Sequence, residues 1–169
     1  MVPALVPVDE EVLDALVRAA TTDADADEVT PALTVGQQWS PERIDWLRRY
    51  HRDRRAGLDG PLGEATWAVV GPAGVLGAVR LQRTDEPGVL LAGVWLGRSA
   101  RGNGLGGSAV AAVLEQAAAA GARTVRAETT ARNTAAVVVL RRLGFLLAES
   151  HGGGAVRATL DLPDARPGR

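Results

Sequence analysis

The order of short apolar runs along the chain limits the available folds more than any other feature. Three strand-like runs, at residues 66–70, 75–83 and 89–96, are joined by short turns that contain glycine and proline. Such closely spaced strands are typical of an antiparallel meander. A meander followed by β-α-β units predicts an α/β (α+β) fold, with a mixed, mostly antiparallel central sheet and helices on both faces. The later elements predicted from periodicity are helices at 105–120 and 133–143 and strands at 124–130, 145–149 and 156–162.

The first third of the chain contributes one short strand and two helices. Residues 5–8 could form a strand, and apolar residues recur at helical spacing within 9–20. Residues 21–40 show no period and are predicted to form a long loop, which in a compact domain is usually functional or mobile. The Ser-Pro pair at 40–41 supplies an N-cap followed by proline at the first helical position, so a helix is expected from there to about Ala56.

Length and composition indicate one ordinary globular domain. The chain has 169 residues, of which 46% are hydrophobic and 23% charged. This suits a single core within residues 1–162, followed by a frayed tail at 163–169. No apolar run reaches the ~20 residues that a membrane helix needs, and the first residues do not have the pattern of a signal peptide. We therefore expect a cytoplasmic protein with no membrane partner.

Charge and cysteine content exclude several classes of site. The formal net charge is -1 at pH 7, whereas nucleic-acid-binding domains are usually basic on one face, so no nucleic-acid partner is expected. The chain has no cysteine and two histidines, which excludes disulfides, cysteine-ligated metals and a histidine-rich metal site. No metal cofactor is expected. The oligomeric state stays open, and a homodimer is one possibility.

A glycine-rich segment follows the last strand of the meander and leads into a helix. It has glycines at positions 97, 102, 104, 106 and 107. Several backbone N–H groups therefore lie at a helix N-terminus with no side chains to cover them. Such a terminus binds anions through its free donors and its partial positive charge, and Arg101 adds a full charge. A diphosphate is the expected ligand.

Other interpretations of the glycine segment are less consistent with its position. A turn that only reverses the chain remains an alternative. A dinucleotide-binding fingerprint would follow the first strand of a βαβ unit and be trailed by an acid ~20 residues on. Here the segment follows a meander instead, and Glu128 lies beyond a helix. A P-loop is excluded because the chain has no Gly-Lys-Ser/Thr sequence.

Two motifs occur in order after the meander. The first is Arg101-Gly102-Asn103-Gly104-Leu105-Gly106, and the second runs from Asn133 to Gly144-Phe145. The first resembles the Arg/Gln-x-x-Gly-x-Gly/Ala motif of GCN5-related N-acetyltransferases, the GNAT superfamily. The second is similar to that family's Asn-capped helix closed by Gly-Phe. The resemblance covers about residues 60–150 and implies a GNAT-like fold and an acetyl-CoA-dependent N-acetyltransferase.

The resemblance also implies how acetyl-CoA, as co-substrate, would be bound. Backbone amides of the glycine segment would bind the pyrophosphate, and the end of the preceding strand would pair with the pantetheine arm and polarise the thioester carbonyl. Asn133 would contact the pantetheine or cap its helix, and Arg141 would contact phosphate or adenine. The residues implied are Trp95, Leu96, Gly97, Arg101, Gly102, Asn103, Gly104, Leu105, Gly106, Gly107, Asn133 and Arg141.

The match to the family breaks at the usual acid and base. Many members have a tyrosine four residues before the glycine of Gly-Phe, where this chain has Leu140, and a glutamate where this chain has Leu91. Catalysis does not require them, because holding an amine beside an activated thioester can by itself contribute ~7–11 kcal/mol. The candidate catalytic carboxylates are Glu128, on the strand at 124–130, and Glu28, in the long loop.

The acceptor site of the family is usually built from the first two helices, their connecting loop and the late hairpin. Carboxylates in that region suit a cationic substrate, and indole rings offer flat surfaces for sugars. Residues 27–31 and 39–55 also look similar to aminoglycoside 2'-N-acetyltransferases that act on kasugamycin. We therefore expect a small-molecule amine, an aminoglycoside-type amino sugar, as acceptor. The expected substrate-binding residues are Asp27, Glu28, Trp39, Trp46 and Glu64.

Two alternatives remain from the sequence. The run Gly93-Val94-Trp95-Leu96-Gly97 resembles the ribosomal-protein branch of the family as well as the aminoglycoside branch, so acetylation of a protein N-terminus is the first. The second is an acetyl-CoA-binding protein without catalysis, which the leucines at 91 and 140 would favour.

Overall fold

The central sheet has the mixed, mostly antiparallel form that the sequence predicts. The computed structural model describes residues 2–163, and most of the expected tail at 163–169 lies outside this range. Seven strands pair in the order β1-β2-β3-β4-β5-β7-β6, and the β4–β5 pair is parallel whereas the others are antiparallel. The strands are β1 (Ala4–Pro7), β2 (Glu64–Gly71), β3 (Gly74–Arg83), β4 (Val89–Leu96), β5 (Thr124–Thr130), β6 (Leu146–Glu149) and β7 (Ala155–Asp161).

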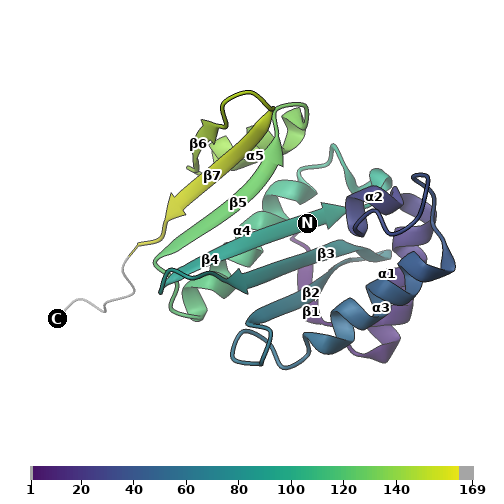
Figure 1. Ribbon diagram of the computed structural model, residues 1–169. Helices are drawn as coiled ribbons and strands as arrows, with labels where there is room; N and C mark the ends of the chain where they lie inside the picture. Colours follow the sequence, from purple (N-terminus) through teal and green to yellow (C-terminus); the bar gives the residue numbers. More distant parts are fainter. Residues whose placement is uncertain (1, 164–169) are drawn as a thin grey trace.

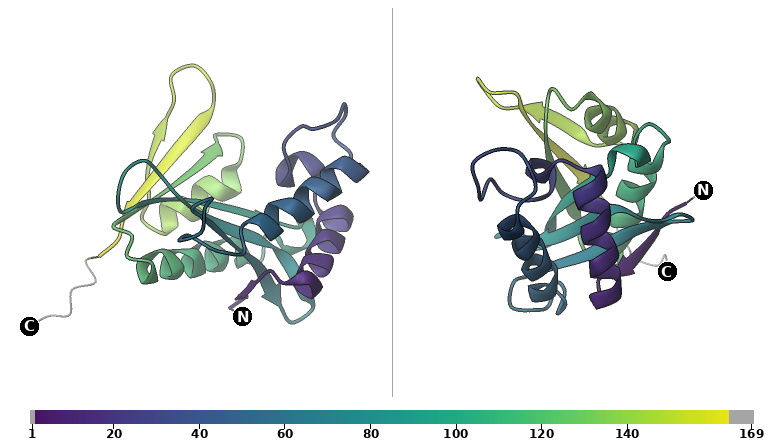
Figure 2. Two further views of the ribbon diagram at one scale, coloured as in Figure 1. Left: turned by 60° about the horizontal axis from the view of Figure 1, so that its bottom comes forward. Right: turned by 90° about the vertical axis from the view of Figure 1, so that its right-hand side faces the viewer.

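Helices cover both faces of the sheet (Figures 1 and 2). On one face, α1 and α3 pack over β2 and β3 around a core that includes Leu13, Leu16 and Leu47. On the other face, α4 and α5 enclose the larger core, with Val113 of α4 and Leu140 of α5. The helices are α1 (Glu10–Asp23), α2 (Ala26–Val29), α3 (Pro41–Asp53), α4 (Leu105–Ala119) and α5 (Thr134–Arg142), with a 3-10 turn, η1, at Arg98–Ala100.

The segment at 21–40 contains more helix than the sequence indicates. The first helix continues to Asp23, because the hydroxyls of Thr21 and Thr22 bond to carbonyls one turn back and so compete little with the helix. The short α2 then begins at a reciprocal cap, in which the carboxylate of Glu28 accepts a hydrogen bond from the backbone N–H of Asp25 at 3.2 Å. Apart from Ala24 and Asp25 between the two helices, only residues 30–40 have no regular structure, so the loop beside the site is shorter than expected.

A buried arginine holds this remaining loop in place. Arg43, in the first turn of α3, is fully buried, and its guanidinium donates to Asp27 Oδ1 at 2.7 Å and to the Gly36 carbonyl at 3.0 Å. It also contacts the hydroxyls of Thr30 and Thr34. A buried charge is tolerated only when it is paired and hydrogen-bonded, and this arrangement meets that condition. Asp27 is therefore engaged by the protein itself.

The acidic α1 and the arginine-rich α3 are joined by ion pairs. Arg48 contacts Asp14 at 2.6 Å, and Arg52 and Arg55 both contact Glu10. Exposed pairs of this kind contribute little each, about 0–1 kcal/mol, but they place opposite charges of the two regions side by side. Among residues 2–163, no helix combines the length and apolar character needed to cross a membrane.

Candidate active site

The glycine segment forms an open loop at the N-terminus of α4. Gly102 and Gly104 have φ angles of +81° and +75°, a conformation that favours glycine. A Cβ atom built on Gly102, Gly104 or Gly107 meets no other atom within 4 Å, so space lies beside the backbone at each of these positions. The loop therefore leaves room for a ligand to approach the main chain closely.

The backbone N–H groups of this loop are available to a ligand. Within the described part of the chain, none of the N–H groups of residues 102–107 has a protein acceptor, whereas Arg101 and Ser108 donate to backbone carbonyls on either side. Free N–H groups at the start of a 15-residue helix attract anions, and the helix dipole adds to the attraction. The chemistry and the space of the loop both fit the diphosphate of a coenzyme.

Strands β4 and β5 separate beside this loop. Their parallel pairing ends at Ala92↔Ala127, yet both strands continue, β4 to Leu96 and β5 to Thr130. Figure 1 shows the two strands diverging towards the glycine loop. In a strand, the backbone groups of successive residues point to opposite sides. The N–H of Gly97 points to β3, where it donates to the Leu76 carbonyl, so the backbone of Leu96 points to the gap. The gap thus presents to an extended ligand main-chain groups of β4 that no longer pair with β5.

Acidic residues of the α1–α2 region bind the start of the glycine loop. Asp23 accepts hydrogen bonds from the backbone N–H and the hydroxyl of Ser99, and Asp25 pairs with Arg98 at 2.8 Å. Arg101 donates to the Leu96 carbonyl at 3.0 Å and to Glu28 Oε2 at 2.8 Å. The guanidinium of Arg101, expected to contact phosphate, lies in this structure between β4 and α2.

A cavity of about 550 Å³ lies on the sheet face under α2 and α3. We call it the site cavity. Its wall on the sheet side is the stretch of β4 from Leu91 to Trp95, the strand that leads into the glycine loop. The residues that line it are Glu28, Val29, Thr30, Pro31, Trp46, Leu47, Tyr50, His51, Arg54, Glu64, Thr66, Ala78, Val79, Arg80, Gln82, Leu91, Ala92, Gly93, Val94, Trp95 and Glu128.

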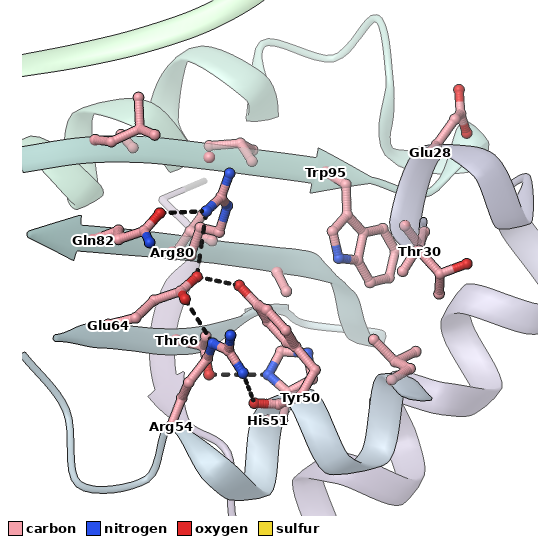
Figure 3. A pocket seen from close by; sticks show the side chains of 18 of the residues that line it. Glu28, Thr30, Tyr50, His51, Arg54, Glu64, Thr66, Arg80, Gln82 and Trp95 are labelled. Atoms are coloured by element: carbon pink, nitrogen blue, oxygen red, sulfur yellow. Dashed lines mark hydrogen bonds and ion pairs between the residues drawn. The ribbon is translucent and has the colours of Figure 1, made fainter. Parts of the chain in front are cut away.

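A buried carboxylate lies at the floor of the site cavity (Figure 3). Glu64 is 3% exposed and accepts hydrogen bonds from Tyr50, from Arg54 Nε at 2.6 Å and from Arg80 Nη1 at 3.3 Å. The guanidinium of Arg54 stacks 3.9 Å from the Tyr50 ring centroid. Gln82 accepts a further hydrogen bond from Arg80 at 3.2 Å.

The environment decides the charge of each floor residue. Burial raises the pKa of Glu64, but the hydrogen bonds from Tyr50 and Arg54 outweigh this and leave it lowered overall. Burial and then the hydrogen bond to Glu64 raise the pKa of Tyr50. Burial, helped by the charge of Arg54, lowers the pKa of His51 to about 4. At neutral pH the carboxyl is therefore ionised, whereas the phenol and the imidazole are neutral.

The two candidate catalytic carboxylates both line the site cavity, in different settings. Glu128 is the first residue of β5 after its pairing with β4 ends, and its exposed side chain lies 3.9 Å from Arg157. Glu28 lies on α2, where the hydrogen bond from Arg101 lowers its pKa despite partial burial. Glu128 is thus held less firmly by other side chains than Glu28, and it lies on a strand that borders the β4–β5 gap.

The expected substrate-binding residues do not all reach the site cavity. Trp46 and Glu64 line it, together with Glu28. Asp27 is bonded to Arg43, and the indole N–H of Trp39 donates to the Ala24 carbonyl at 2.9 Å, so both stabilise the loop next to the cavity.

Several expected cofactor residues have local structural partners. Asn133 caps α5 by accepting from the N–H of Ala136 at 3.1 Å, and Arg141 is exposed in its last turn. The Trp95 side chain lines the site cavity, whereas Leu96 points into the core on the opposite face. Leu140 is buried in the same core, so no acidic hydrogen is available at that position.

Sequence reasoning missed the arginines of the cavity floor. Polar side chains at Glu64, Thr66, Arg80 and Gln82 alternate along two otherwise apolar strands, and the register places Glu64 beside Gln82 and Thr66 beside Arg80. This alternation was a signal that the strands share a polar patch on one face. Gln82 in turn pairs with Leu91, the position at which many GNAT enzymes have a glutamate. Glu64, Gln82 and Leu91 therefore form one row across β2, β3 and β4.

Comparisons with known proteins agree with this geometry. Residues 4–146 match the family described as "Acetyltransferase (GNAT) domain". A comparison with curated protein sequences finds no match.

Solved structures of similar fold include three acetyltransferases. The GNAT domain of S. lividans PAT is 16% identical, with a TM-score of 0.71 over 95% of this chain and 90% of that one. An acetyl transferase from Salmonella typhimurium that modifies the N-terminal serine of a 50S ribosomal subunit protein is 17% identical, with a TM-score of 0.71 over 96% of each chain. A phosphinothricin acetyltransferase from Sinorhizobium meliloti, in complex with acetyl-CoA, is 17% identical, with a TM-score of 0.68 over 96% and 89%.

The buried imidazole predicts a pH dependence of stability. The pKa of His51 is about 4 in the folded state and ~6.5 in the unfolded chain, so the unfolded state binds more protons between these values and stability falls as pH decreases through this window. The loss on moving from pH 7 to pH 5 is about 2 kcal/mol by this linkage. Urea unfolding at both pH values measures it.

A His51→Gln variant supplies the control for this measurement. It removes the titrating group, so the difference in unfolding free energy between pH 7 and pH 5 should largely disappear. An unchanged difference in the variant would assign the pH dependence to other groups.

Proposed function

This chain belongs to the GNAT family of acetyltransferases, and on that premise we propose that it acetylates the primary amine of a small molecule held in the site cavity. The enzyme is acetyl-CoA-dependent, as the family is. One observation carries the proposal: the same strand, β4, forms a wall of the site cavity and one edge of the gap that leads to the glycine loop. An amine in the cavity and a thioester in the gap would meet at this strand.

The glycine loop would hold the diphosphate of acetyl-CoA. The free N–H groups of residues 102–107 and the dipole of α4 supply the donors and the positive potential. Of the three strand-end residues expected to bind the pantetheine arm, Leu96 would contribute its main chain, because the backbones of Trp95 and Gly97 face β3. To contact a phosphate, Arg101 would have to exchange its bonds with the Leu96 carbonyl and Glu28 for one with the ligand.

The chain's own residues must orient the amine and accept its proton. Acetyl-CoA supplies an activated acyl carbon, and the amine nitrogen forms the new C–N bond as the C–S bond breaks and coenzyme A leaves as a thiolate. The ammonium proton must pass to a base. Glu128 suits this role because it lines the site cavity at the point where β5 separates from β4.

An amino-sugar acceptor is less well supported by the observed contacts. The carboxylates that would attract a polycation are largely bonded to the protein's own arginines, Asp25 to Arg98 and Asp27 to Arg43. The aminoglycoside hypothesis stays a prediction of the sequence. Acetylation of a protein N-terminus is the second candidate, because one similar structure is described as modifying an N-terminal serine.

A panel of acceptors tests the proposed function. The purified protein is incubated with acetyl-CoA and each of three amine classes: small amino acids and monoamines, aminoglycosides, and N-terminal peptides. We expect turnover, followed by free thiol release and by mass spectrometry of the product, in the first class. Turnover of peptides alone would contradict a small-molecule acceptor.

The pyrophosphate assignment predicts the effect of Gly104→Asp. The new side chain would occupy the open space beside the loop, adopt an unfavourable positive φ and repel phosphate. We expect the affinity for coenzyme A, measured by calorimetry, to fall at least roughly 100-fold, since loss of a charged contact and added repulsion together exceed ~3 kcal/mol.

Gly121→Asp is the matched control for this variant. Gly121 has φ of +80° and open space at the other end of the same helix. This change should cost similar stability but leave coenzyme A affinity within about threefold. Equal losses in both variants would refute the assignment of the diphosphate to the loop.

The base assignment predicts a pH-dependent defect in Glu128→Gln. At neutral pH we expect kcat to fall about 100-fold, the lower end of general-base contributions, with an unchanged KM for acetyl-CoA. The defect should shrink as pH rises towards the pKa of the amine, because the substrate then arrives already deprotonated. Glu149→Gln, on β6, is the control. A defect of constant size across pH would show that Glu128 is not the base.

A further inference from the structure

The floor of the site cavity carries an excess positive charge. Arg54 and Arg80 are both bonded to the single carboxylate of Glu64. Tyr50 and His51, the other ionisable groups of the floor, are neutral at pH 7 for the reasons given above. One carboxylate and two guanidinium groups leave a net charge of +1 among side chains that are buried or partly buried.

The acids at the rim of the cavity do not balance this charge. Glu28 is bonded to Arg101 at 2.8 Å, and Glu128 faces solvent and Arg157 at 3.9 Å. Within residues 2–163, neither rim carboxylate pairs with a guanidinium of the floor. An uncompensated charge taken out of water is costly unless a partner of opposite sign binds it. The floor therefore favours an anionic ligand group.

Arg80 has donors free to make that contact. Its Nη1 is shared between Glu64 and Gln82, and within residues 2–163 its Nε and Nη2 have no acceptor. The side chain is 39% exposed and lies across Gly93, where an added Cβ would come within 2.5 Å of Nε. Figure 3 shows it pointing from β3 towards β4. Because Gly93 directly follows the last β4 residue paired with β5, Arg80 lies beside the strand gap.

We propose that the acceptor carries a carboxylate close to its amine, as an amino acid does, and that Arg80 binds this carboxylate. This rests on the proposed function, since it names the class of acceptor for that reaction. A guanidinium presents parallel N–H donors that match a carboxylate, and charge-assisted bonds of this kind are stronger than neutral ones. The same positive charge would lower the pKa of a nearby ammonium and so favour the neutral amine that attack requires. A polycationic amino sugar would be repelled.

Matched pairs of acids and amides test the proposal. The acceptors are L-methionine, L-phenylalanine and L-tryptophan, each compared with its carboxamide, which keeps the amine and the side chain but has no negative charge. For the wild-type protein we expect kcat/KM to be roughly 10- to 100-fold higher for the acids, the range of a hydrogen bond to a charged group. Equal or better turnover of the amides would overturn the proposal.

Variants of Arg80 assign the preference to that residue. Arg80→Gln should reduce kcat/KM for the acids to the level of the amides and change the amides by less than about threefold. Arg80→Lys keeps the charge without the planar donors, and should retain part of the preference. Arg83, on the same strand, is bonded to Asp59 outside the cavity, so the Arg83→Gln variant should keep the full preference for the acids. Equal loss for acids and amides in Arg80→Gln would reduce Arg80 to a structural role.

A binding measurement separates this inference from the proposed function. If no amine is acetylated although acetyl-CoA binds, the proposed function fails. Calorimetry with the same amino acids then decides the inference by itself. Binding that is lost in Arg80→Gln, while circular dichroism shows that the variant is folded, would support a carboxylate site. Binding that is absent, or unaffected by Arg80→Gln, would overturn it.

Discussion

The end of backbone pairing between β4 and β5 is the constraint on which the site depends. Beyond Ala92 and Ala127, both strands keep an extended backbone but lose each other as partners. Buried main-chain N–H and C=O groups require partners, so an open edge inside a sheet invites an extended ligand. The glycine loop begins where β4 ends, and the site cavity lies on the face of the same strand. The separation therefore brings the glycine loop and the site cavity to one strand.

Two layers of contacts stabilise the region around this gap. On one side, α4 packs through Leu105 and Val113 into the main core, which fixes the helix terminus that presents the free N–H groups. On the other side, Asp23 and Glu28 bind residues of the loop that precedes α4. Helices α1 and α2 are thus bonded directly to the residues that precede the open glycine loop.

The polar floor of the cavity explains how a chain without the family's usual tyrosine and glutamate still forms a charged site. Leu140 is part of the core and Leu91 offers only a methyl surface, but the neighbouring strands supply Glu64 and Arg80 on the same sheet face. A polar side chain on one strand can take the place of one on a neighbouring strand, since cross-strand neighbours lie about 5 Å apart. The excess guanidinium gives the floor of this cavity a local positive charge that composition does not reveal, because the whole chain is nearly neutral.

Local patterns in the sequence determined most of the elements, their order and the open glycine loop. Periodicity and turn residues are local properties, and β4, α4 and β5 begin within a residue of their expected positions. Only the tertiary structure decided which charges remain available to a ligand. Asp27 and Arg43 are 16 residues apart, and Glu64 and Arg80 lie on different strands, so their pairing depends on packing and register. Two acidic residues thus have different roles: Asp27 holds a loop, whereas Glu64 lines the cavity. Long-range contacts, not the presence of a carboxylate, set the charge that each region presents.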